Sequence, residues 1–359
     1  MKNKTIGVIL LNLGGPDSIQ AVKPFLYNLF SDRQIIRLGP SFMQQPLAWL
    51  ISATRSKKTE QYYKLIGGKS PILDITTAQA KALEELLNGR GDKNREFSGS
   101  MSFRVYTGMR YWRPFIEDAV LQMQKDGIKK VIALSLYPQY SIATSGSSFS
   151  KFNEVASHFQ METACVESWY NNPYYIDALV DVIRKGLDSF SPSSPVDNSA
   201  FSLQPSAFGS NSSFIPHPSS FSDDVHVLFS AHSLPRKIIA QGDPYVDQTM
   251  GTIQEITKRL DIKWRLSYQS KSGPVKWLAP STEDKIQELA KEGVRNILMV
   301  PISFVSDHIE TLYEIDILYK NLAGKLEVEM KRTESLNTHP VFIEALKDIV
   351  LKSLNDKEQ

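Results

Sequence analysis

The amino-acid sequence predicts an α/β protein of two domains with a similar plan, each a parallel sheet flanked by helices. The chain has 359 residues, which suits two domains of about 150 residues each. Short apolar runs rich in β-branched residues alternate with helical patterns, as they do in right-handed βαβ units. The helix-ending glycines Gly127 and Gly293 are each followed by an apolar strand and a serine-containing turn. This repeated order predicts one such domain in each half.

Six apolar runs are the expected strands. The first, residues 6–11, ends at Asn12 and a Gly-Gly-Pro turn, as a buried parallel strand does. The other five runs are residues 103–107, 131–136, 225–229, 265–268 and 296–301. Apolar residues at helical spacing predict helices over residues 18–30, 114–126 and 282–292. We therefore expect an N-terminal domain over residues 1–160 and a C-terminal domain over residues 161–350.

A segment of unusual composition, residues 189–222, interrupts the C-terminal domain. It is dominated by Ser, Pro, Phe and Asn and carries almost no charge until Asp223. Such a composition buries too little apolar surface to hold one shape, so we expect a disordered insertion. The alternative is an ordered loop that its phenylalanine side chains pack against the domain.

Composition excludes several classes of function. The chain has 41 Lys and Arg against 39 Asp and Glu, a formal net charge of +2, so a nucleic-acid partner is not expected. Cys165 is the only cysteine, which rules out an internal disulfide and is typical of a reducing compartment. Every apolar run is shorter than the roughly 20 residues that a membrane-spanning helix needs. We therefore expect a cytoplasmic protein.

A histidine follows one of the predicted strands. In the segment VLFSAHSLP, His232 comes just past the apolar run, where open α/β sheets place their ligands. Small residues surround it and Pro235 follows, so a tight turn should leave the imidazole exposed to a cleft. A structural histidine held by hydrogen bonds is the alternative.

A cluster of acidic residues follows the last predicted strand. The segment SDHIETLYEID contains Asp307, His308, Glu310, Glu314 and Asp316. If this segment enters a helix, Glu310 and Glu314 are i,i+4 neighbours and Asp307 lies on the same face. No Lys or Arg between residues 307 and 318 compensates the charges. The apolar residues between the acids make the segment amphipathic, which favours a functional site over a solvated acidic surface.

Imidazole and carboxylate together suggest a metal chemistry. Fe²⁺ accepts nitrogen and oxygen ligands with modest affinity, which suits a site that passes the ion onward. Histidine titrates near neutral pH and can also act as a base. The apolar segment 38–55, which ends at Arg55, offers walls for a flat macrocycle with a cation at its rim. A core helix is the alternative for this segment.

These residues belong to blocks that resemble the ferrochelatase family along nearly the whole chain, apart from the insertion. The blocks, in chain order, are LLNLGGP (10–16), EQYYKLIGGKSPI (60–72), YTGMRYWRP (106–114), YPQYSIATSGSS (137–148), FSAHSLP (229–235), GDPY (242–245), YQSKSGPVKWLAP (268–280) and SDHIETLYEID (306–316). Agreement of this many blocks in order is highly specific, whereas a match to one motif would not be.

The resemblance implies two Rossmann-like domains with a porphyrin cleft between them, and it implies roles for individual residues. His232 and Glu310 would be the catalytic pair and the metal site. Asp307, His308 and Glu314 would form an acidic path for protons and metal. The residues that would bind the porphyrin are Leu13, Arg55, Tyr63, Ser70, Arg110, Tyr111, Tyr137, Gln269 and Trp277. Leu13 stands where some members have methionine, a change that preserves shape.

The resemblance also implies the substrates, which are Fe²⁺ and a porphyrin, and no tightly bound cofactor. The chain has no cysteine after Cys165, so the iron–sulfur cluster of some relatives is not expected. The blocks around residues 66–72 and 269–280, and the apolar lip at 42–51, favour protoporphyrin IX over the four-propionate coproporphyrin. That lip leaves a peripheral membrane contact open. The alternative functions are a coproporphyrin ferrochelatase and a cobalt chelatase of corrin synthesis.

Deletion of residues 192–221 should preserve both fold and activity. Shortening a flexible surface loop changes its closure entropy by only about 0.6 kcal/mol per doubling of length. The measurement is the thermal transition and the metal-insertion rate of the deletion variant. Aggregation or loss of the transition would instead indicate that the phenylalanine side chains pack against the domain.

Overall fold

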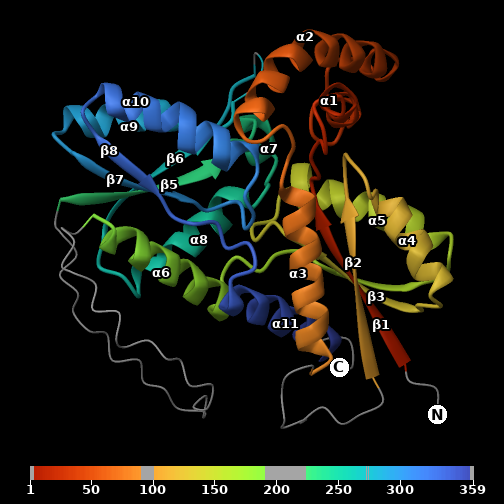
Figure 1. The fold of residues 1–359 in the computed structure, drawn as a ribbon. Helices are drawn as coiled ribbons and strands as arrows, with labels where there is room; N and C mark the ends of the chain where they lie inside the picture. Colours follow the sequence, from red (N-terminus) through yellow and green to blue (C-terminus); the bar gives the residue numbers. More distant parts are fainter. Residues whose placement is uncertain (1–3, 90–100, 191–223, 272, 274, 356–359) are drawn as a thin grey trace.

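The computed structural model of the chain describes residues 4–89, 101–190, 224–271, 273 and 275–355, and in this part it contains two parallel four-stranded sheets (Figure 1). The first sheet has the order β2-β1-β3-β4 and the second β6-β5-β7-β8. The strands of the first are β1 (Lys4–Asn12), β2 (Met101–Met109), β3 (Lys130–Ser135) and β4 (Glu162–Val166). Those of the second are β5 (Val225–His232), β6 (Lys263–Gln269), β7 (Asn296–Pro301) and β8 (Glu329–Arg332). The prediction of two α/β halves with one plan is confirmed.

The six predicted strands are present, and two further strands lie at sheet edges. β4 and β8 each pair with one neighbour only, β3 and β7 respectively. Their sequences, ETACV and EMKR, are short and contain no apolar run longer than three residues, which is why the sequence pattern did not predict them. Since β4 begins at Glu162 and pairs with β3, the first sheet continues past residue 160, the expected end of the N-terminal domain.

Helices cover both faces of each sheet. On the outer face of the first sheet lie α4 (Ile116–Lys125) and α5 (Ser147–Ser157), and on that of the second lie α9 (Thr282–Lys291) and α10 (Lys320–Lys325). The predicted ends of α4 and α9 are confirmed, because Gly127 (φ 75°) and Gly293 (φ 88°) adopt the left-handed conformation there. The expected helix over 18–30 is shorter at its start, since α1 spans Val22–Ser31.

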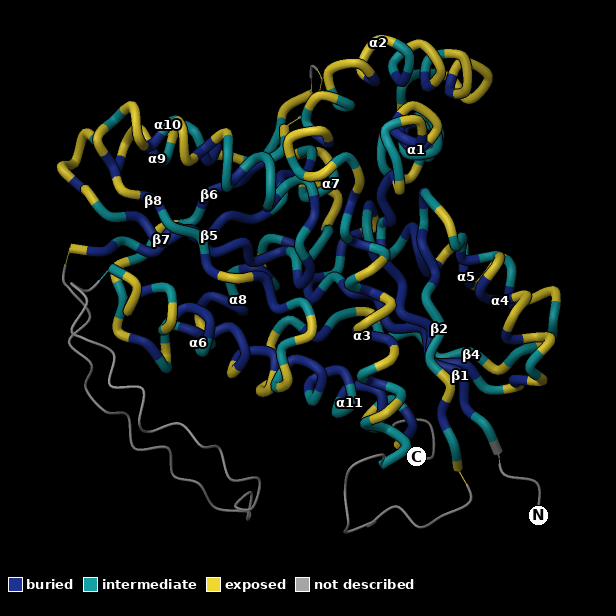
Figure 2. The backbone as a smooth tube through the Cα atoms, in the orientation of Figure 1, coloured by how far each residue is buried: buried dark blue, intermediate teal, exposed yellow. Residues whose placement is uncertain are grey.

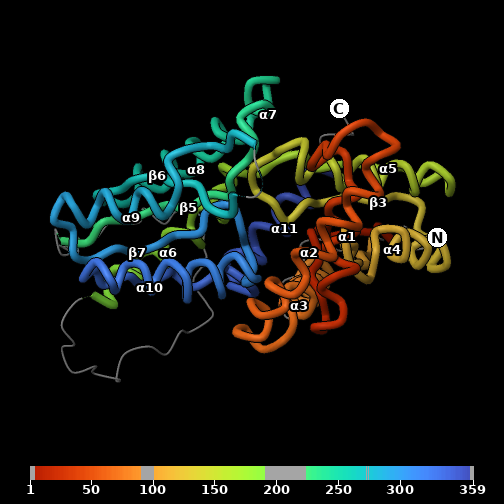
Figure 3. Tube along the Cα trace, turned by 90° about the horizontal axis from the view of Figure 1, so that it is seen from above, coloured from red at the N-terminus to blue at the C-terminus, as the bar shows by residue number. Residues whose placement is uncertain are grey.

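One continuous core joins the two halves. The helices that contribute to it are α3 (Ile72–Leu87), α6 (Pro173–Asp188), α8 (Tyr245–Thr257) and α11 (Pro340–Asn355). Apolar residues of β1 and β3 belong to the same buried cluster as those of β5 and β7. The last helix, α11, comes from the C-terminal half but contacts α3, β3 and β4 of the N-terminal half. The halves lie side by side (Figure 3) and share this core, and each also has a buried cluster of its own on its outer face.

A helical arm stands apart from the sheets. It consists of α1, the short η1 (Ser41–Met43) and α2 (Gln44–Leu65), and its small apolar cluster includes Tyr63 and Tyr111. Figure 2 shows that much of α2 is exposed. Phe42 is 79% exposed and Trp49 58% exposed, so the apolar segment 42–51 is a surface and not the core helix that was the alternative. The predicted insertion lies outside the described residues from residue 191 onward.

Buried side-chain amides join the halves at the centre of the molecule. Gln139 donates from Nε2 to the hydroxyl of Thr252 (3.0 Å) and to the carbonyl of Ile302 (3.3 Å). Gln79 on α3 donates to the Ser306 hydroxyl and the Asn337 carbonyl. These contacts fix the segment that follows β7 against the N-terminal half.

Replacing Gln139 by Ala should lower the free energy of unfolding by about 1–3 kcal/mol, because two buried groups lose their hydrogen-bond partner. Gln122, whose amide contacts Asp126 on the surface, is the matched control, and Gln122→Ala should change stability by less than about 0.5 kcal/mol. Denaturant unfolding of both variants measures the difference. Equal stability of the two would contradict the role of Gln139.

Candidate active site

The carboxyl ends of the central strands of both sheets meet at a hollow. In the sheet order β2-β1-β3-β4, the neighbouring strands β1 and β3 flank the topological switch point, where the strand order reverses. Open α/β sheets bind their ligands at such points. The hollow is lined from the N-terminal half by Asn12, Leu13, Ile72, Leu136 and Tyr137. From the C-terminal half it is lined by Phe304, Val305, Ser306 and His308. The switch point of the second sheet lies between β5 and β7. The switch points of the two sheets therefore face one another across this hollow.

His232 and Glu310 form an ion pair beside this hollow. His232 is the last residue of β5, and Glu310 begins the π-helix η3 (Glu310–Tyr319). Nδ1 of His232 lies 2.8 Å from Oε2 of Glu310. The backbone of His232 is fixed as well, since its N–H donates to the Ser303 hydroxyl and its carbonyl accepts from the Tyr245 hydroxyl. The imidazole is thus held by one nitrogen, which leaves Nε2 for a ligand.

The two partners shift each other's pKa. Burial lowers the pKa of His232, but the charge and hydrogen bond of Glu310 outweigh burial and leave it above its usual value. Burial likewise raises the pKa of Glu310, and the charge and hydrogen bond of His232 outweigh it and bring the pKa well below its usual range. Each partner therefore favours the charged form of the other.

Glu314 lies next to this pair. The expected helical neighbours Glu310 and Glu314 lie on η3, and their carboxyl groups meet at the hydroxyl of Ser270. Gln269 donates from Nε2 to the Glu310 carbonyl (3.0 Å) and to the Glu314 carboxyl (3.3 Å). Burial, followed by the charge of Glu310, raises the pKa of Glu314 well above its usual value. One carboxyl is held ionised and its neighbour tends to hold a proton.

Asp307 does not share this face, so that part of the prediction is wrong. It precedes η3, and its carboxylate accepts from Thr311, Ser335 and Asn337 and pairs with Arg332 at 3.1 Å. Burial raises the pKa of Asp307, but Arg332 and these hydrogen bonds outweigh it and leave the pKa lowered. With its oxygens occupied, Asp307 is an anchor of the loop and is not free to relay protons or metal.

Arg332 joins Asp307 to the π-helix. At the end of β8, its guanidinium also binds both oxygens of Asp316 on η3, at 2.8 Å each. A π-helix is a rare conformation that frequently occurs at functional sites. The bidentate pair therefore secures η3 on the side away from Glu310 and Glu314. No sequence pattern pointed to this arginine, because it lies outside the acidic block and at the end of a short edge strand.

His308 is a second histidine of the hollow. It is 5% exposed, and its Nδ1 lies 3.1 Å from the Ser306 carbonyl, which can only accept a hydrogen bond. Nδ1 therefore carries the hydrogen, and buried Nε2 has no hydrogen-bond partner among the described residues. Burial lowers the pKa of His308, so its Nε2 presents a lone pair.

Comparison with known proteins identifies the family. The family model described as Ferrochelatase matches residues 5–354. A protein named Ferrochelatase from Geotalea uraniireducens is 45% identical over 361 residues, which cover 99% of this chain and 100% of the relative. The chain belongs to the ferrochelatase family. Another Ferrochelatase, from Desulfotalea psychrophila, is 45% identical over 98% of both chains. The predicted function, insertion of Fe²⁺ into a porphyrin by a metal chelatase of haem synthesis, is confirmed by these matches.

Solved structures agree with the ferrochelatase fold. The structure described as SirB from Bacillus subtilis with Fe³⁺ has a TM-score of 0.51 and 12% sequence identity, and the match covers 99% of this chain and 97% of that one. At this identity the likeness concerns the fold alone. It agrees with two packed α/β halves in one molecule.

Three of the porphyrin-binding residues expected in a ferrochelatase lie around the hollow. Leu13 and Tyr137 line it directly. Burial raises the pKa of the Tyr63 and Tyr137 phenols, and the charge of Glu310 adds to the effect in both, so both rings lie near the acid pair. Tyr63 and Tyr137 thus approach Glu310 from the N-terminal half, and Leu13 lines the hollow beside Tyr137.

Arg110 and Tyr111 lie on a separate, internally paired wall. Arg110 donates to Asp32 at 2.7 Å and to Ser147 at 3.0 Å, and the Tyr111 hydroxyl donates to the same Asp32 oxygen at 2.7 Å. The Arg110 guanidinium also stacks on the Tyr111 ring, 4.9 Å from its centroid. Asp32, which the sequence analysis did not single out, fixes both side chains and neutralises the arginine.

Three further residues that were expected to bind the porphyrin, Ser70, Arg55 and Trp277, lie in different environments. Ser70 is buried against Gly15 and its hydroxyl accepts from the Ile72 N–H at the start of α3. Arg55 lies on exposed α2 over the Phe30 ring. The indole nitrogen of Trp277 is buried and has no hydrogen-bond partner in the described chain.

Gln269 differs from the expectation that it grips a propionate. It is 1% exposed, and its Oε1 accepts from the Ser230 hydroxyl at 2.6 Å while Nε2 contacts both acids. With both ends of its amide used, Gln269 positions the acids and is not placed to bind a propionate. Its neighbour Ser270 contacts both acids as well. The only signal for Ser270 in the sequence is its place just after a strand end.

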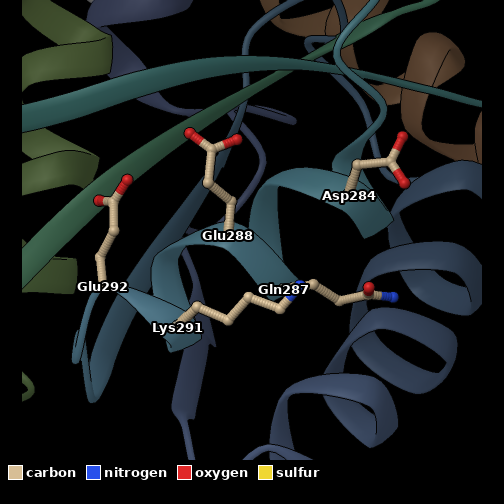
Figure 4. Close-up of a pocket in the computed structure, with 5 residues that line it drawn as sticks. All are labelled: Asp284, Gln287, Glu288, Lys291 and Glu292. Carbon is tan, nitrogen blue, oxygen red and sulfur yellow. The ribbon is translucent and has the colours of Figure 1, made fainter.

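A second hollow lies on the surface of α9 (Figure 4). It is lined by Asp284, Gln287, Glu288, Lys291 and Glu292. All five come from one exposed helix and its end, and Glu288 pairs with the neighbouring Lys285. It contains none of the expected site residues and is a solvated helix face.

The pH dependence of metal insertion should show the effect of Glu310 on the pKa of His232. Only neutral imidazole can accept a pyrrole proton or bind a metal, so kcat/KM should rise with pH as His232 loses its proton. Because Glu310 raises the pKa of His232, this rise should lie above the ordinary value of 6.5. In the residual activity of Glu310→Gln the rise should move to lower pH. Glu314→Gln should move it less, since Glu314 contributes less to the shift. Identical profiles in all three proteins would contradict the pairing.

Proposed function

We propose that this chain inserts Fe²⁺ into protoporphyrin IX and so forms protohaem in the cytoplasm. The observation that carries this proposal is the His232–Glu310 pair, 2.8 Å apart, beside a hollow between two α/β halves. Imidazole nitrogen and carboxylate oxygen suit Fe²⁺, and a site that offers few protein ligands can release the ion to the macrocycle. Iron is a substrate in this scheme, and no resident cofactor is needed.

Metal insertion requires two protons to leave the pyrrole nitrogens as one divalent cation enters. His232, once neutral, can accept one of them at Nε2, because Nδ1 is already bound to Glu310. The carboxylate of Glu310 then stabilises the imidazolium that forms. His308, with a free lone pair on buried Nε2, offers a second acceptor at the same hollow. Charge is balanced throughout, since two protons are exchanged for Fe²⁺.

The apolar arm supports protoporphyrin as the substrate. Phe42, Met43, Trp49 and Leu50 are all exposed on η1 and α2. Residues 42–51 contain no Lys or Arg, and the Lys23 ammonium of α1 lies over the Trp49 ring, 5.5 Å from its centroid. Vinyl groups suit such a wall, whereas two further propionates would lose hydration there without partners. The same exposed segment, residues 42–51, could rest on a membrane surface. No helix among the described residues has the length and apolar character needed to cross a bilayer.

His232→Ala should abolish metal insertion and leave porphyrin binding within about threefold of wild type, because the imidazole acts on the metal and the pyrrole protons. Porphyrin fluorescence measures binding, and the change in the visible spectrum with Zn²⁺ or anaerobic Fe²⁺ measures insertion. Insertion near the wild-type rate would remove His232 from the mechanism.

Side-by-side kinetics with two porphyrins test the substrate. We expect kcat/KM for protoporphyrin to exceed that for coproporphyrin by at least about tenfold, the effect of roughly 1.4 kcal/mol from unpaired carboxylates. A higher kcat/KM for coproporphyrin would overturn the choice of porphyrin and leave the chelatase activity in place. Preference for Co²⁺ and a corrin precursor over both would favour the cobalt chelatase alternative.

A further inference from the structure

The hydroxyl of Ser270 lies between the two carboxyl groups of η3. Its Oγ is 2.6 Å from Oε2 of Glu310 and 2.5 Å from Oε2 of Glu314. The same Glu310 oxygen is bound to Nδ1 of His232. These contacts make one unbroken line of four groups, His232, Glu310, Ser270 and Glu314.

A hydroxyl has a single hydrogen and can donate it to only one carboxylate. Both short contacts of Ser270 are hydrogen bonds only if the second carboxyl donates its own hydrogen to Oγ. The bridge therefore joins one carboxylate and one carboxylic acid and removes the repulsion that two neighbouring carboxylates would suffer. Among the described residues, the hydrogen bond that would remain to the Glu314 carboxyl without Ser270 is the longer contact with Gln269, at 3.3 Å.

The backbone of Ser270 is specialised for this place. Its φ is 65°, in the left-handed region that few residues other than glycine adopt. Ser270 follows the last residue of β6, and the preceding Gln269 is fixed through Ser230 and through the Ser233 N–H, which donates to its carbonyl. Uncommon backbone conformations of this kind persist where the surroundings hold them, often at functional sites.

We propose that Ser270 is a positioning residue for metal insertion, one that ties the Glu314 carboxyl to the His232–Glu310 pair. This inference rests on the proposed function, because it assigns Ser270 a task at the same site. Ser270 acts through the two acids and contacts neither metal nor porphyrin in this scheme. Its loss should therefore reduce turnover and leave porphyrin binding intact.

Two variants separate the hydroxyl from the backbone. Ser270→Ala removes the hydroxyl and keeps a side chain at the left-handed position, whereas Ser270→Gly removes it and relieves that position. If the hydroxyl matters, both variants should lose about tenfold in kcat for Zn²⁺ insertion, the effect of one hydrogen bond to a charged group. The KM for protoporphyrin should stay within about twofold.

The matched control is Glu327→Gly. Glu327 is exposed, also has a positive φ (57°), and lies at the end of α10, outside the site. This variant should keep the wild-type kcat, which controls for any general effect of placing glycine at a left-handed position.

A double-mutant cycle tests the route of action. If Ser270 acts through Glu314, Ser270→Ala should cost about tenfold in the wild-type background but less than about threefold in the Glu314→Gln background, because coupled residues are not additive. Fully additive losses, wild-type kcat in Ser270→Ala, or loss confined to KM would each overturn the proposal. Failure of the wild-type protein to insert any metal would instead overturn the proposed function, so the two failures are distinguishable.

Discussion

The contact between His232 and Glu310 is the interaction on which the site depends. It joins the end of the central strand β5 to the start of η3, two places that are 78 residues apart in the chain. Each partner is partly buried and would be costly alone, so the pair persists because each stabilises the charge of the other. The surrounding contacts, from Ser303 and Tyr245 on His232 and from Ser270 and Gln269 on the acids, are arranged to keep this pair in one geometry.

The π-helix is fixed from two sides for the same reason. On one side Ser270 and Gln269 bind its acids, and on the other Arg332 binds Asp316 and, just before the helix, Asp307. Acidic residues close in sequence thus have opposite tasks. Glu310 and Glu314 lie where their carboxyls can act on a ligand, whereas Asp307 and Asp316 are neutralised by one guanidinium and hold the helix in place.

The sequence predicted the features that local pattern controls. Apolar runs identified the four central strands and the edge strands β2 and β6, and the position at the end of an apolar run was enough to single out His232. Glu310 and Glu314 were predicted to share one helix face, because residues four apart in a helix are neighbours whatever the rest of the fold is. Asp307 was misplaced because its environment depends on Arg332 and Asn337, which reach it only through tertiary packing. Gln269 was misassigned for a similar reason, since its buried hydrogen bonds to Ser230 and the acids are invisible in the chain order.

The shared core has a consequence for how the molecule forms during synthesis. One face of the first sheet and its helix α3 are covered by α11, residues 340–355, which are synthesised after all the strands of both sheets. The N-terminal half therefore leaves the ribosome with apolar surface of β1, β3 and α3 still in water, and it cannot complete its own core before the C-terminal half has followed. Completion of the fold therefore depends on α11. A protein truncated before this helix would lose packing in the N-terminal half.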